Sequence, residues 1–206
     1  MAVDLADLVS TWRTAVVTSE IQNGVIGEQA ALPALAEVAR QTMLPAVARL
    51  VTAARRADVE VVHATFERRA DGKGANTNAR LFNGMAKSPV QLQVGSEAVQ
   101  VVPEVGVRAT DIVLTRTHGL NPMAGTDLDA VLRNLGVTTI VVAGVSVNVA
   151  ITNLVMDAVN LGYNVVLPRD AVCGVPVEYA DAVIDNTLSL LATITTVDEL
   201  AAIWKG

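Results

Sequence analysis

The sequence has little cysteine, few aromatic residues and little basic character. Its one cysteine, Cys173, cannot form an intramolecular disulfide. The apolar segments are too short and too often interrupted for a bilayer, which needs roughly 20 continuous residues. The start, MAVDLADLVSTWRTAVV, has no charged segment followed by a long apolar run. We therefore expect a soluble cytoplasmic protein with no membrane partner.

Positive charge is scarce as well. The 15 basic residues include only three lysines, Lys73, Lys87 and Lys205, and the formal net charge is -6. Such a chain has no basic surface to replace phosphate counterions, so we expect no nucleic-acid partner. The remaining 12 basic residues (15 minus 3) are arginines, a bias that points to a GC-rich bacterial genome.

What the chain does have is aliphatic residues, because 51% of its 206 residues are hydrophobic and only 3% are aromatic. This content suffices for a core of Ala, Val, Leu and Ile, and we expect one domain over residues 1–206. Six apolar runs without clear alternation predict parallel strands covered on both faces. They lie at 15–17, 59–62, 112–114, 139–143, 165–167 and 192–196.

Segments with helical periodicity separate these runs, at 42–57, 127–135, 149–161 and 177–191. Asp127 is placed to cap the second of them, and Gly136 and Gly162 to end the second and third. The alternation predicts an α/β fold, a Rossmann-like three-layer sandwich with a six-stranded parallel sheet flanked by helices. In such folds ligands bind beyond the carboxyl ends of the strands.

Two regions interrupt this alternation. Residues 22–36, with Gly24, Gly27 and Pro33, are predicted to form a loop after the first strand. Residues 67–95 are predicted to make a long excursion over the surface or toward a neighbouring subunit.

Cofactor and metal signals are missing. Neither a Gly-x-Gly-x-x-Gly nor a Walker A stretch occurs, so the sheet does not imply a nucleotide site. The two histidines, His63 and His118, are too few for an all-histidine metal centre. His63 ends an apolar run and is expected to be a structural core residue. We expect no cofactor and no protein-bound metal.

Glu20 is the first candidate catalytic residue, since it follows the first apolar run where a strand meets a pocket-facing loop. Burial there would favour a protonated carboxyl group, which can act as a general acid. The alternative is a loop carboxylate that pairs with an arginine or caps a turn.

At this point the chain resembles a family, the isochorismatase-like or cysteine hydrolases. The resemblance is carried by TSEIQN at 18–23, GTDLD at 125–129, VLRNLGV at 131–137, AGVSVNVAI at 143–151 and DAVNLGY at 157–163. It implies the same six-stranded fold, assembly into a homo-oligomer such as a dimer or tetramer, and hydrolysis of a small-molecule substrate. In most of the family an aspartate, a lysine and a nucleophilic cysteine form the catalytic triad.

This sequence departs from that triad at every position. Glu20 stands at the aspartate position, and Ala150 stands at the cysteine position, where a methyl group cannot be a nucleophile. Arg116 is the nearest cation to the lysine position, with Thr115 and Thr117 as alternatives. The resemblance therefore excludes covalent thiol catalysis by the usual route.

Cys173 must be weighed as a displaced nucleophile. It follows the fifth predicted strand, one strand further along than the family's cysteine, and nothing near it in sequence lowers its pKa. We expect instead a small buried hydrophobic residue.

Other features of the family's pocket are retained in the sequence. Val145-Ser146 stands where the family commonly has a non-proline cis peptide. Backbone amides from Asn148 onward are placed to hold an anion or a carbonyl oxygen, although Asn148 itself is equally suited to turn formation and helix capping. The candidate substrate-binding residues are Gln22, His118, Ser146, Asn148 and Val149.

Three functions are compatible with these residues. The first is hydrolysis without a cysteine, in which Glu20 protonates a vinyl ether or a related C–O or C–N bond and Arg116 clamps a substrate carboxylate. The second is an inactive member, a pseudoenzyme that binds a small ligand or acts as an oligomeric scaffold, with Glu20 and Arg116 paired to each other. The third is unrelated chemistry in the same cleft.

Overall fold

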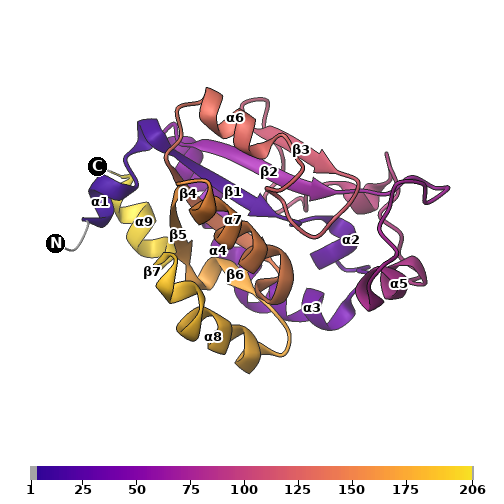
Figure 1. The fold of residues 1–206 in the computed structure, drawn as a ribbon. Helices are drawn as coiled ribbons and strands as arrows, with labels where there is room; N and C mark the ends of the chain where they lie inside the picture. The colour runs from indigo at the N-terminus through magenta and orange to yellow at the C-terminus, as the bar shows by residue number, and fades with distance from the viewer. Residues whose placement is uncertain (1–3, 206) are drawn as a thin grey trace.

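A twisted parallel sheet forms the centre of the computed structural model, which describes residues 4–205 (Figure 1). The strand order is β3-β2-β1-β4-β5-β7, and a two-residue strand, β6, pairs with β4 off this path. The strands are β1 (Thr14–Ser19), β2 (Glu60–Phe66), β3 (Ile112–Arg116), β4 (Thr139–Val145), β5 (Asn164–Pro168), β6 (Val172–Cys173) and β7 (Thr193–Thr195). The predicted six-stranded parallel sheet is confirmed, and β6 is an addition.

Helices cover both faces of the sheet (Figure 1). One face packs against α1 (Leu5–Leu8), α2 (Asn23–Ile26), α3 (Pro33–Val38), α4 (Leu44–Arg56) and α9 (Val197–Ile203). The other packs against α6 (Leu128–Asn134), α7 (Thr152–Asn160) and α8 (Val177–Asn186). In strand β1, Val16 faces the first helical layer, while Ala15 and Val17 face the second. Because both faces of this strand are covered, its sequence is apolar without alternation. The three-layer prediction is therefore confirmed.

The other helical segments are short. Helix α5 (Arg80–Ala86) lies beyond one end of the sheet (Figure 1). A π-helical turn, Ala39–Met43, joins α3 to α4, and a second one, Val147–Ile151, leads into α7. The 3-10 turns are Thr11–Arg13, Glu97–Val99, Arg169–Ala171 and Leu188–Leu190. Within residues 4–205, none of the helices combines the length and the apolar character needed to cross a bilayer.

The predicted helix ends are correct for the glycines and wrong for Asp127. Gly136 and Gly162 follow α6 and α7 with φ values of 73° and 86°, a backbone conformation that glycine adopts without a steric penalty. Asp127 occupies the position before α6, but its side chain makes no capping bond. Thr126 Oγ1 accepts a hydrogen bond from the Leu128 amide instead (3.2 Å).

The region 22–36 is more ordered than the predicted loop. It contains α2 and the start of α3. Pro33 is compatible with α3 because it occupies the first turn, where the missing N–H has no helical partner to lose. Gly24 lies within α2 at a close contact, since a Cβ atom there would lie 2.9 Å from Ala98 Cβ.

Sheet topology fixes where a ligand can bind. From β1 the chain continues to β2 and β3 on one side, and then returns to β4 on the other. The carboxyl ends of β1 and β4 therefore form the point at which the strand order reverses, which in doubly wound sheets opens a crevice.

Candidate functional site

A pocket with a volume of about 100 Å³ opens at the carboxyl ends of β1 to β4. Glu20, Arg116 and Ala150, which the resemblance in sequence assigns to the triad positions, all line it. Ser146 supplies a hydroxyl group, and the other lining residues are apolar or glycine. They are Gly24, Val25, Ala31, Leu32, Leu35, Phe66, Leu81, Phe82, Met85, Gly119, Leu120, Val145 and Val149.

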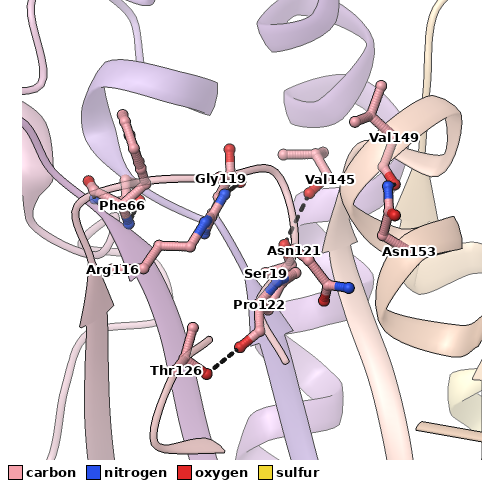
Figure 2. Close-up of polar contacts among 12 residues, drawn as sticks. Ser19, Phe66, Arg116, Gly119, Asn121, Pro122, Thr126, Val145, Val149 and Asn153 are labelled. Atoms are coloured by element: carbon pink, nitrogen blue, oxygen red, sulfur yellow. Dashed lines mark hydrogen bonds and ion pairs between the residues drawn. The ribbon is translucent and has the colours of Figure 1, made fainter. Parts of the chain in front are cut away.

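Glu20 and Arg116 form an ion pair in this pocket, in which Arg116 Nη2 donates to Glu20 Oε1. Their side chains are 18% and 5% exposed, so solvent screens the pair poorly. The guanidinium also lies over the Phe66 ring, with 5.3 Å from Cζ to the ring centroid. Figure 2 shows Arg116 extending from the end of β3 toward Gly119. Its Nε and Nη1 atoms are buried and have no hydrogen-bond partner among residues 4–205.

The backbone holds Glu20 in place. Its amide donates to Ala64 O on β2 (3.0 Å), and its φ of 53° turns the chain sharply out of β1. A non-glycine residue in this left-handed region is uncommon, and such residues cluster at functional sites.

The ends of β1 and β4 are unusually close. Ser19 Oγ donates to Val145 O at 3.1 Å (Figure 2). Gly144 has a φ of 106°, and a Cβ atom at this position would lie 2.2 Å from Ser19 O. Only glycine therefore fits at this position of β4, next to the pocket-lining Val145.

The wall that carries Ala150 begins at the Val145–Ser146 peptide bond, which is cis as the resemblance implies. The amides of Val149 and Ile151 both donate to Ser146 O at 3.1 Å. These two amides are thus occupied within the chain and do not offer the free anion contact expected from the sequence. Asn153 Nδ2 donates to Val149 O at 2.9 Å on the next turn (Figure 2).

Gln22 and Asn148 are not among the residues that line this pocket, and their side chains instead hold neighbouring backbone segments together. Gln22 is fully buried, and its amide bonds both the Phe66 backbone (2.8 Å for N and for O) and Val99 O (2.7 Å). Asn148 exchanges hydrogen bonds with the Val175 backbone at 2.9 and 3.1 Å. Both amides are therefore engaged by the chain, and Asn148 bridges to a distant loop, neither capping a helix nor forming a local turn.

Of the three residues that the sequence allows at the lysine position, Arg116 lines the pocket and Thr115 and Thr117 do not. Thr115 Oγ1 instead shares a hydrogen bond with Thr65 Oγ1 (2.8 Å). His118 is exposed and borders a smaller adjoining hollow, separate from the Glu20 side of the pocket.

His63 is a fully buried core residue on β2, whose Nδ1 lies 2.8 Å from Thr18 Oγ1. Burial lowers the pKa of its imidazole; Asp111 raises it and Arg55 lowers it further. Arg55 and Asp111 form a buried ion pair beside it, with 2.5 Å between Nη2 and Oδ2.

Cys173 lies on β6 and is buried outside the pocket lining. Burial raises the pKa of its thiol to about 12, so the reactive thiolate is scarce. Among residues 4–205, no three His, Cys, Asp or Glu side chains are grouped as a metal ion would require.

The sequence reasoning missed the apolar residues that cover the pocket. Leu81, Phe82 and Met85 reach it from α5, and Leu35 reaches it from α3. They belong to the two regions that interrupt the alternation of strands and helices, so periodicity gave no sign of their role. The segment 67–95 thus folds over the pocket of its own chain.

Comparison with known proteins agrees with this fold. The Isochorismatase domain model matches residues 14–199. The cysteine hydrolase from Pseudomonas syringae pv. phaseolicola 1448A has a similar structure, with a TM-score of 0.81 and 23% identity over 100% of this chain and 99% of its own. An isochorismatase family protein from Burkholderia thailandensis has a TM-score of 0.77 and 25% identity over 95% and 97%.

Sequence comparison points the same way. The isochorismatase family protein YwoC of Bacillus subtilis (strain 168) is 26% identical over 162 residues, 77% of each chain. The fold, the order of motifs and the family match over 14–199 lead to one assignment. This chain belongs to the isochorismatase-like hydrolase family.

Proposed function

We propose that this chain is a family member that binds a small molecule in the Glu20–Arg116 pocket and turns it over neither by covalent thiol catalysis nor by acid catalysis from Glu20. The observation that carries the proposal is the ion pair between Glu20 and Arg116 beside the methyl group of Ala150. Alanine stands at the position of the family's nucleophile, and the two charged groups are paired with each other.

The ion pair also bears on acid catalysis. A general acid must present its proton to the substrate, whereas the Glu20 carboxyl group is engaged by the Arg116 guanidinium. The same contact occupies part of the guanidinium that would clamp a substrate carboxylate. Both roles that the sequence suggests for this pair therefore require the pair to separate.

Hydrolysis without a cysteine is the second candidate, and the accessibility of Glu20 favours it. Its side chain is 18% exposed and lines the pocket, so a substrate can reach the carboxyl group. In this reaction a carboxylate substrate would take over Arg116, and the released Glu20, in its protonated form, would protonate the terminal carbon of a vinyl ether. Water would add to the resulting cation and return a proton to Glu20, and the hemiketal formed would break its C–O bond to give a ketone and an alcohol.

Two assays separate the candidates. Purified protein is mixed with isochorismate and with a set of simple amides, and the release of pyruvate or ammonia is followed. We expect no turnover, together with a thermal shift on adding a pocket ligand. Turnover that the wild type shows and Glu20→Gln loses would establish the acid route and overturn our proposal.

A second variant tests whether the rest of the pocket can still support catalysis by a thiol. Ala150→Cys restores a thiol at the family's nucleophile position without changing Glu20 or Arg116. We expect no amidase activity, because the charged pair differs from the family's aspartate and lysine.

The resemblance further supports a cytoplasmic homo-oligomer, a dimer or tetramer. Sedimentation of the full chain will measure the oligomeric state.

A further inference from the structure

The charges in the pocket indicate the class of ligand, an inference that rests on the proposed function. We propose that the pocket selects an uncharged, mostly apolar molecule with a carbonyl acceptor, such as an amide, ketone or ester. Glu20 is then the residue that excludes carboxylates.

The charges that line the pocket disfavour a carboxylate ligand. Only two residues that line the pocket carry a charge, Glu20 and Arg116, and these are in contact with each other. A carboxylate that approaches the guanidinium also approaches the carboxylate of Glu20, and like charges repel strongly where water is largely excluded. A neutral carbonyl group meets no such repulsion.

Arg116 has hydrogen-bond donors that no residue of the described chain uses. Arg116 lines the pocket and is 5% exposed, and its Nε and Nη1 atoms have no partner within residues 4–205. A buried donor without an acceptor is unfavourable, and a ligand oxygen that accepts from it removes that penalty. One carbonyl oxygen supplies this acceptor without adding a charge.

The wall of the pocket is largely apolar. Phe66, Leu35 and the α5 residues Leu81, Phe82 and Met85 surround the charged pair, and Ser146 provides the one other polar side chain of the lining. Such a surface favours a hydrocarbon or aromatic body through burial of apolar area. The ligand therefore combines an apolar body with a single acceptor.

Matched probes test this proposal by isothermal titration at pH 7.5. Benzamide and benzoate have nearly the same shape and differ in charge, as do isobutyramide and isobutyrate. We expect each amide to bind the wild type at least about tenfold more tightly than its carboxylate partner. Tighter binding of the carboxylates would overturn the proposal, and that result requires no variant to fold.

Glu20→Gln provides the second measurement, because it removes the charge and keeps a side chain of nearly the same size. We expect benzoate to gain at least about tenfold in affinity, since Arg116 loses its counterion. Glu60→Gln, at the opposite end of β2, removes the same charge away from the pocket and should change nothing. An unchanged amide preference in Glu20→Gln would contradict the role of Glu20. If none of the four probes binds either protein, the binding function itself fails.

Discussion

Glu20 and Arg116 meet across the carboxyl end of β2, although they are 96 positions apart in the sequence. Glu20 directly follows β1 and Arg116 ends β3, and these two strands flank β2 in the sheet. Parallel strands place their carboxyl ends at one edge, so a negative and a positive side chain are brought together there. Each side chain thereby limits the chemistry of the other.

Cys173 is predicted to be unreactive in the folded protein. Its thiol is buried, and with a pKa of about 12 only roughly one thiol in 10,000 is ionised at pH 8. Iodoacetamide should leave the native protein unmodified while labelling one site per chain in urea, as measured by intact mass. Rapid labelling of the native protein would reopen the possibility that Cys173 is a nucleophile.

Acidification is predicted to destabilise the protein through His63. The pKa of this buried imidazole is lowered in the folded state, so the unfolded chain binds more protons as the pH falls below 6.5. Stability should therefore fall between pH 7.5 and 5.5, measured by urea unfolding. Above this range the contribution of His63 is constant.

A pair of histidine variants isolates this effect. His63→Asn keeps a polar group facing Thr18 and should flatten the pH dependence between pH 7.5 and 5.5. His118→Asn changes the exposed histidine and should leave it as in the wild type. Equal slopes in the two variants would contradict the assignment to His63.

Gly144→Ala is predicted to distort the pocket wall. The added Cβ atom would meet Ser19 O at 2.2 Å, and the φ of 106° is unfavourable for alanine. We expect a loss of about 3 kcal/mol or more in the free energy of unfolding. Gly136→Ala is the matched control, because its φ is also positive but nothing lies within 4 Å of the new atom. It should cost only about 1 kcal/mol.

Phe82→Ala is predicted to weaken ligand binding without weakening the fold. Phe82 lines the pocket from α5, a helix that has no buried side chain. The unfolding free energy should change by less than about 0.5 kcal/mol, while the affinity for benzamide should fall about tenfold. Leu190→Ala, at a residue that is 80% exposed, should leave both quantities unchanged. A Phe82→Ala protein with wild-type affinity would show that α5 does not contact the ligand.

The sequence predicts the sheet well because β1, β2 and β4 are buried along almost their whole length. The expectation of cover on both faces is wrong for β3, which alternates in burial and exposes Val113 at the edge of the sheet. The runs at 15–17 and 139–143 are uninterrupted, and they lie within β1 and β4. Strand β6 escapes prediction because Val172 and Cys173 are too short a run to show a period. Asp127 misleads because Thr126, its neighbour, supplies the capping oxygen.

The charged end of the pocket is predictable and its apolar end is not. Glu20 can be located because it follows a recognisable strand, and Arg116 because the resemblance makes it the cation nearest to the family's lysine position. Phe82 and Met85 lie in a segment with no long hydrophobic period, so only the folded chain shows that they line the pocket. Gln22 is a polar residue that the sequence suggests as a substrate contact. In the structure its side-chain amide is used by hydrogen bonds to the backbone of Phe66 and Val99.

Helix α5 places pocket-lining residues on an element that has no fully buried side chain. Tolerance to mutation should therefore differ sharply between α5 and the sheet. Substitutions at Leu81, Phe82 or Met85 can retune ligand selectivity at little cost to folding, so libraries confined to these three codons offer an economical route to altered binding.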